Sequence, residues 1–128
     1  GASVVFNPEP SYEDDRGAQW PKKAATITVS DLPEGTLKAI ELDVSANKDT
    51  KPKINVTVGG VAFGDEYTLA SCKHATAEFK GSAEADTVVI SIGATTDGSA
   101  YLKSIKLVYE AGAPVDQAVL QKIEVSSN

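Results

Sequence analysis

Apolar and polar residues alternate along most of the chain from Thr26 onward. The alternation is clearest in TITVS (26–30), LKAIELDVSA (37–46), KINVTV (53–58) and TVVISIG (87–93). Successive side chains of a β-strand point to opposite faces, so this period of two predicts strands with one buried face. No segment of the sequence keeps the longer period of an amphipathic helix. The residues expected to point inward are Ile27, Val29, Ile40, Leu42, Val44, Ile54, Val56, Val58, Phe79, Val88, Ile90, Ile92, Ile105, Leu107 and Tyr109.

Shorter runs complete a set of about eight strands, spaced about every 10 to 14 residues. They are SVVF (3–6), DEYTLA (65–70), ATAEFKG (75–81) and AYLKSIKLVYE (100–110). Each strand has a single apolar face, so two sheets must cover each other. We therefore predict an all-β fold, an antiparallel two-sheet β-sandwich of the jelly-roll kind. The stretch at 7–23 contains three prolines and a glycine, which predicts a long surface loop.

The end of the chain has a different composition. EAGAPVDQA (110–118) is rich in small residues and contains a proline, as linkers often are. The alternation then resumes in AVLQKIEVSSN (118–128). We predict a sandwich module over residues 1–111, followed over 112–128 by a linker and the first strand of another module. The alternative is that this tail folds back as an edge strand of the same domain.

Charge and composition exclude several classes of partner. The formal net charge is −6, and Arg16 is the only arginine. Nucleic-acid binding requires clustered lysine and arginine, so we expect no nucleic-acid partner. No apolar run approaches the length of about 20 residues that crosses a membrane as a helix. Cys72 is the only cysteine and cannot form an internal disulfide, so stability must come from the core. We expect a monomer.

The residues that usually carry catalysis are sparse. His74 is the only histidine and lies two positions from Cys72, so the two side chains would share one face of a strand. No signature of a cysteine nucleophile surrounds them, and zinc would need more ligands than this stretch offers. The GxSxG motif and phosphate-binding glycine loops are also missing from the sequence. We therefore predict that the chain is not an enzyme.

One short stretch combines aromatic and polar side chains in the way that sugar sites require. Tyr12 and Trp20 flank Asp15, Arg16 and Gln19. Aromatic rings stack on the C–H faces of sugars, while charged and amide groups hydrogen-bond their hydroxyls. These five residues are our candidate ligand-binding residues. The alternative is that Trp20 packs into one end of the sandwich and anchors the loop, because tryptophan is usually largely buried.

The same stretch also contains a run of carboxylates. Glu13, Asp14 and Asp15 are consecutive, and calcium accepts carboxylate and backbone oxygen ligands. The spaced acidic pattern of an EF-hand loop is missing here. We therefore name these three residues as candidate ligands of a structural calcium ion and expect no other cofactor.

Two longer segments carry a resemblance. QWPKKAATITVSDLPEGTLKAIELDVSA (19–46) and GSAYLKSIKLVYEAG (98–112) resemble β-sandwich modules close to the galactose-binding-like fold, found in exported multidomain proteins of anaerobic gut bacteria. The tail LQKIEVSSN (120–128) resembles the start of a bacterial Ig-like domain. The resemblance implies an accessory module that is extracellular, on the cell surface or in the periplasm. Some such modules bind glycans, others act as spacers or adhesin-type domains, and many hold a structural calcium near one chain end.

Overall fold

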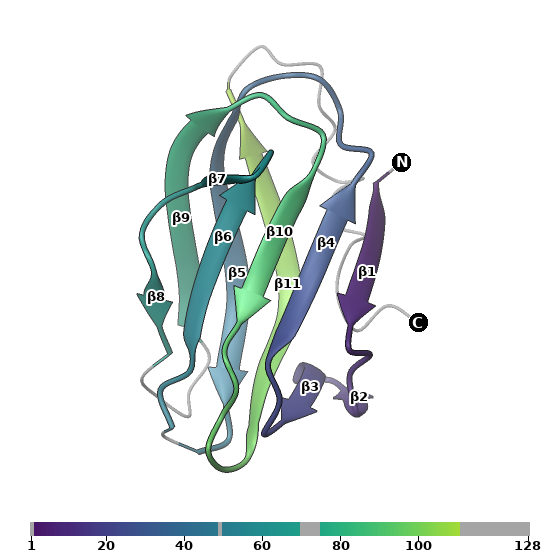
Figure 1. Cartoon of the computed structure of the whole chain (residues 1–128), viewed down its shortest axis with the longest axis vertical. Helices are drawn as coiled ribbons and strands as arrows, with labels where there is room; N and C mark the ends of the chain where they lie inside the picture. Colours follow the sequence, from purple (N-terminus) through teal and green to yellow (C-terminus); the bar gives the residue numbers. More distant parts are fainter. Residues whose placement is uncertain (1, 49, 70–74, 111–128) are drawn as a thin grey trace.

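The computed structural model describes residues 2–48, 50–69 and 75–110. Two antiparallel sheets, A and B, face each other, which confirms the predicted sandwich. Figure 1 shows sheet A in front of sheet B. The described residues form eleven strands and no helix. Sheet A has the order β1 (Ser3–Asn7), β4 (Ala25–Ser30), β10 (Val88–Ile92), β6 (Lys53–Val58) and β7 (Val61–Ala62), and β8 (Tyr67–Thr68) also pairs with β6. Sheet B has the order β2 (Tyr12–Asp14), β3 (Gly17–Pro21), β11 (Ser99–Tyr109), β5 (Leu37–Ala46) and β9 (Ala75–Ala83).

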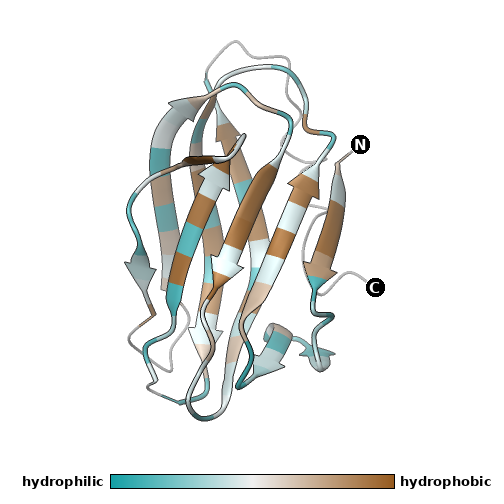
Figure 2. Cartoon of the chain, viewed as in Figure 1, coloured by the Kyte–Doolittle hydropathy of each residue, from teal (hydrophilic) through white to brown (hydrophobic). Residues whose placement is uncertain are grey.

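The core lies between the two sheets. All fifteen side chains predicted to point inward are buried, from Ile27 in β4 to Tyr109 at the end of β11. Figure 2 shows the alternating apolar and polar bands along the front strands. Burial of this apolar surface is the main favourable contribution to folding, so the alternation determines which face of each strand turns inward.

A bulge in β11 shifts the alternation by one residue. The register of β11 against β5 changes between Leu102 and Ser104, so Lys103 is the extra residue. Ala100 and Leu102 point inward before the bulge, whereas Ile105 and Leu107 do so after it. A bulge exchanges the two faces of a strand in this way. Tyr101 therefore lies on the outer face of sheet B, where its side chain is only 4% exposed.

The prediction of a long loop over residues 7–23 is wrong in part. Two of the three strands beyond the predicted eight lie in this stretch, and the third is β7. β2 and β3 form a hairpin at the edge of sheet B, and β3 pairs with the first residues of β11. Ala18 and Trp20 alternate with Gln19 and point into the core. Gly17 has φ 110° and lies directly against the backbone of Leu102 in β11. Glycine adopts this conformation without the steric penalty of a Cβ atom, so it permits the close approach.

The chain enters and leaves the sandwich at the same end. β1 begins at the end where β11 finishes, as Figure 1 shows. The backbone N–H of Glu110 donates to the carbonyl of Thr36 there, at 2.8 Å. The β2–β3 hairpin lies toward the opposite end of the molecule.

Some predictions fall outside the described residues. They are the pair Cys72 and His74 and the linker and strand over 112–128. Within the described ranges, no helix has the length and apolarity needed to cross a membrane.

Candidate functional site

The predicted ligand-binding residues lie on and around the β2–β3 hairpin. Tyr12 of β2 pairs with Gln19 of β3, and Gln19 pairs with Tyr101 of β11. Tyr101 in turn pairs with Ser45 of β5. Paired residues share one face of a sheet, and neighbouring strands lie about 4.8 Å apart, so the four side chains form one row across the outer face of sheet B. We call this row, together with Arg16, the hairpin surface.

Arg16 connects the hairpin turn to this row. Its guanidinium carbon lies 5.0 Å from the ring centroid of Tyr101, and its Nη1 lies 3.3 Å from the Tyr101 hydroxyl oxygen. On its other side, Nη2 donates to Oδ2 of Asp14 at 2.9 Å, and Nε lies 3.3 Å from the same oxygen. The backbone N–H of Arg16 also donates to Asp14 Oδ1, at 2.8 Å. A cation over an aromatic face and a forked contact to a carboxylate both fix the guanidinium.

The position of Trp20 differs from the predicted stacking platform. Its side chain is fully buried, so it presents no ring face to a ligand at the surface. The Phe6 ring packs edge-on against it with centroids 5.9 Å apart, and its Nε1–H donates to the Pro8 carbonyl at 2.8 Å. The alternative interpretation, in which Trp20 anchors this stretch in the core, is confirmed. Tyr12 is the exposed ring of the pair, at 64% of its full accessibility.

Two polar side chains of the hairpin surface are buried. Gln19 and Ser45 are 5% and 2% exposed. Ser45 Oγ has no hydrogen-bond partner within the described part of the chain, whereas the Gln19 side chain interacts with Asp14 and helps to lower the pKa of that carboxyl. A buried polar atom without a hydrogen bond costs about 1–3 kcal/mol.

Hydrogen bonding to Arg16 lowers the pKa of Asp14 from 3.8 to about 2; the side-chain contact is the largest cause, and the Arg16 backbone N–H is the next. The Asp14–Arg16 contact therefore adds stability above pH 3.8, and this contribution is lost as the pH falls through about 2. We expect the Asp14 carboxyl carbon to titrate near pH 2 by NMR, while circular dichroism follows folding. In Arg16→Leu the midpoint should rise toward 3.8, and a wild-type midpoint already near 3.8 would contradict the contact.

The three candidate calcium ligands are not brought together. Glu13 and Asp14 are neighbours in β2, so their side chains point to opposite faces, and Asp14 is held by Arg16. Burial, with Glu9 nearby, raises the pKa of Glu13, which disfavours its charged form. No group of three potential metal-binding side chains occurs among the described residues. This geometry lends the calcium prediction no support.

No protein-family model and no curated protein matches the sequence. Solved structures do share the fold. The CBM32 of AlyQ, in complex with 4,5-unsaturated mannuronic acid, has a TM-score of 0.61 at 10% identity, over 84% of this chain and 95% of that one. A pectin-binding carbohydrate-binding module has a TM-score of 0.55 at 14% identity, over 88% of this chain and 93% of that one.

A similar unit also occurs within a larger enzyme. The GH29 fucosidase of Ruminococcus gnavus, in complex with fucose, has a TM-score of 0.60 at 14% identity, over 88% of this chain. The match covers 26% of the fucosidase chain, so this chain spans about a quarter of its length. At these identities the likeness shows a common β-sandwich fold, and function must be argued from the site.

The chemistry of the hairpin surface suits binding better than catalysis. A general base needs a pKa near the working pH, whereas the Asp14 carboxyl that contacts Arg16 has a pKa of about 2. Arg16 stays charged throughout the physiological range, because Asp14 and Tyr101 raise its pKa further. What the surface offers is an exposed ring and fixed hydrogen-bonding groups.

Two members of the hairpin surface were not predicted from the sequence. Tyr101 and Ser45 lie far from Arg16 along the chain and join it only through strand pairing. The alternation in 37–46 could have placed Ser45 on the outer face, since it follows the inward Val44. Tyr101 could not be assigned to a face, because the bulge at Lys103 reverses the alternation in β11.

Proposed function

We propose that the chain is a non-catalytic, carbohydrate-binding accessory module and that a sugar binds at the hairpin surface. The observation that carries this proposal is the exposed Tyr12 ring and the half-exposed Arg16 on one sheet face, connected through the buried Gln19 and Tyr101. The fold shared with carbohydrate-binding modules supports it.

Each group has a role that sugar chemistry can use. The exposed Tyr12 ring can stack on the C–H face of a pyranose, as aromatic rings do on apolar surfaces. Arg16 supplies N–H donors, and Asp14 accepts hydrogen bonds from hydroxyl groups. Their side chains remain 51% and 40% exposed, so a ligand can reach both. Asp15 lies in the exposed turn beside them, and we include it as an outer contact.

Replacing Tyr12 should weaken glycan binding while leaving the fold intact. We expect Tyr12→Ala to lower the affinity roughly tenfold, because loss of a stacking contact removes about 1–1.5 kcal/mol. Val61→Ala, an equally exposed position on sheet A, should bind like the wild type. The measurement is a plant, host and bacterial glycan panel followed by NMR titration of the ligands that bind. Trp20 fluorescence is a poor reporter, because Trp20 is buried away from the surface.

The second candidate function is a structural spacer or adhesin-type domain that positions neighbouring modules. The burial of Trp20 favours it, because it removes one of the two rings from the predicted sugar site. The glycan panel separates the two functions. If Tyr12→Ala and Val61→Ala bind a glycan equally well, the hairpin surface is not the sugar site. If no glycan binds at all, the spacer function gains support.

We further propose that the parent protein is exported, with this module extracellular, on the cell surface or in the periplasm. The resemblance of residues 19–46 and 98–112 to modules of exported proteins supports this location. So does the fold shared with carbohydrate-binding modules. Its partners would then be a glycan and the neighbouring modules of its own polypeptide, with the module itself monomeric.

A further inference from the structure

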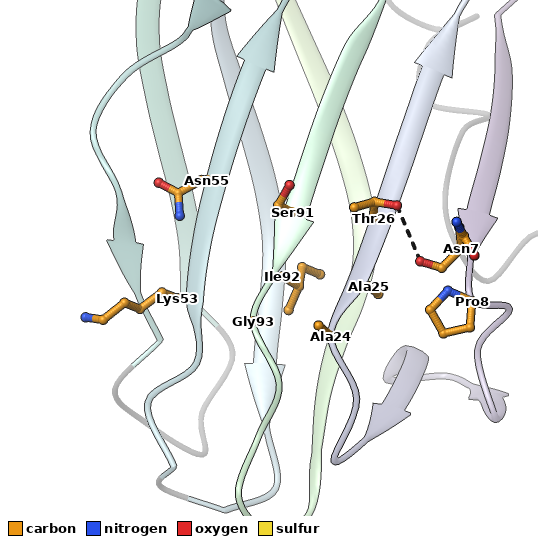
Figure 3. Close-up of a pocket in the computed structure, with 10 residues that line it drawn as sticks. All are labelled: Asn7, Pro8, Ala24, Ala25, Thr26, Lys53, Asn55, Ser91, Ile92 and Gly93. Carbon is orange, nitrogen blue, oxygen red and sulfur yellow. Dashed lines mark hydrogen bonds between the residues drawn. The ribbon is translucent and has the colours of Figure 1, made fainter. Parts of the chain in front are cut away.

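The outer face of sheet A carries a groove that the sequence did not reveal. Figure 3 shows it near the ends of β1, β6 and β10, with Asn7 and Pro8 at one side and Lys53 and Asn55 at the other. Its volume is about 550 Å³. The hairpin surface lies on the other sheet, so the two regions are separate.

Strand pairing aligns four polar side chains along this groove. Asn7 of β1 pairs with Thr26 of β4, Thr26 pairs with Ser91 of β10, and Ser91 pairs with Asn55 of β6. At about 4.8 Å between strands, the row is about 14 Å long and offers a polar group at each step. This step is comparable with the length of one pyranose unit in a linear glycan.

The backbone holds this row firmly. In each of the three inner strands the residues beside the polar one are buried, as Ile54 and Val56 are beside Asn55. A shift of the strand pairing by one residue would expose these apolar side chains to water, so the register is strongly specified. Side chains placed on paired strands are positioned more accurately than those on loops.

The row retains hydrogen-bonding capacity. Asn55 Nδ2 donates to Glu66 Oε2 at 3.0 Å, and Thr26 Oγ1 lies 3.4 Å from the Asn7 carbonyl oxygen. The side chains of Asn7 and Ser91 make no hydrogen bond within the described ranges. Amide and hydroxyl groups both donate and accept, as sugar hydroxyls do, so they suit a ligand rich in hydroxyl groups.

The charge at the groove favours a neutral ligand. Lys53 is the only charged side chain among the lining residues. Its Nζ lies 3.7 Å from Glu66 Oε1 and 3.3 Å from Thr68 Oγ1, so a carboxylate next to the groove offsets the cation. The whole chain carries a net charge of −6, which repels polyanions.

We propose that this groove is a second binding site and that it holds a neutral, linear oligosaccharide laid across the strands from Asn7 to Asn55. Pro8 adds an apolar contact at one end of the row. The proposal rests on the groove itself and does not require the hairpin surface to bind sugar. With both sites occupied, one module would hold two glycan segments on opposite faces.

The test uses cellohexaose, xylohexaose and mannohexaose, with hexagalacturonate and a chitosan hexamer as charged probes. In ¹⁵N NMR titrations of the whole chain, at least one neutral hexaose should shift the amide signals of Thr26, Ser91 and Asn55. The double variant Asn55→Ala/Ser91→Ala should bind that hexaose roughly tenfold more weakly, since two hydrogen bonds are lost. The matched control is Thr57→Ala/Val89→Ala, which changes the next outward row on the same two strands and should bind within about twofold of wild type.

The outcomes separate this proposal from the proposed function. If binding survives Tyr12→Ala but not the groove variant, the groove is a site of its own. If all five probes leave the groove signals unchanged at millimolar concentration, the groove is not a glycan site, whatever the hairpin surface does. If only a charged probe binds there, the assignment to neutral ligands is wrong. Thermal unfolding of both double variants shows whether they remain folded.

Discussion

Replacing Trp20 with alanine is expected to lower the free energy of unfolding by about 4 kcal/mol, the typical cost of removing a large buried aromatic side chain. Trp20 is fully buried, packs edge-on against Phe6 and donates to the Pro8 carbonyl. It therefore connects β3 of sheet B to Phe6 in β1 of sheet A and to Pro8 directly after it. Its loss leaves a cavity and an unpaired carbonyl in the same place.

Urea unfolding followed by far-ultraviolet circular dichroism measures this effect, since the variant has no tryptophan. Trp20→Phe should recover part of the loss, because a ring again fills the space while the hydrogen bond to Pro8 stays absent. Tyr12→Ala is the surface control and should change stability by less than about 0.5 kcal/mol. A loss below about 1 kcal/mol in Trp20→Ala would show that the ring is not a core anchor.

Gly17→Ala is the second change with a large expected effect, a loss of about 2–4 kcal/mol. The glycine has φ 110°, and an added Cβ would collide with the Leu102 carbonyl and lie 2.7 Å from Lys103 Cα. Both contacts are to backbone atoms of β11, which cannot move away by rotation as a flexible side chain could. We expect β3 to separate from β11 and Arg16 to lose its contact with Tyr101.

A matched glycine isolates the collision from the unusual φ angle. Gly60 has φ 84°, and a Cβ there would meet nothing within 4 Å. Gly60→Ala should therefore cost only the conformational strain, about 1 kcal/mol. Chemical denaturation gives both values, and NMR of the Arg16 guanidinium reports the contact with Tyr101. Equal losses in the two variants would mean that the close approach of Gly17 to β11 contributes nothing.

The sequence predicted the sandwich well because its core strands obey a local rule. The alternation from Ile27 to Tyr109 depends only on which face of each strand is buried, and burial is strong enough to impose it. The β2–β3 hairpin was missed because its evidence is non-local. Gly17 and Pro21 are typical of turns, yet they bound a strand whose partner, β11, lies some eighty residues away in the chain.

The candidate site was predictable in part for the same reason. Tyr12, Arg16 and Gln19 are close in sequence, and the hairpin keeps them close in space. Composition could not decide whether Trp20 is a platform or a core residue, since both roles suit a large amphipathic ring. The row from Asn7 to Asn55 requires the pairing of four strands, and a pattern within one strand carries no information about its neighbours.

Because β1 begins at the end of the sandwich where β11 finishes, the two ends of the module lie at the same pole in any protein that contains it. Chain segments joined to β1 and to β11 would both meet the module at this one end. The module would then project to one side of the rest of the polypeptide. The hairpin surface and the groove lie toward the far pole. A long polymer bound at that pole would lie away from the points where those segments join the sandwich.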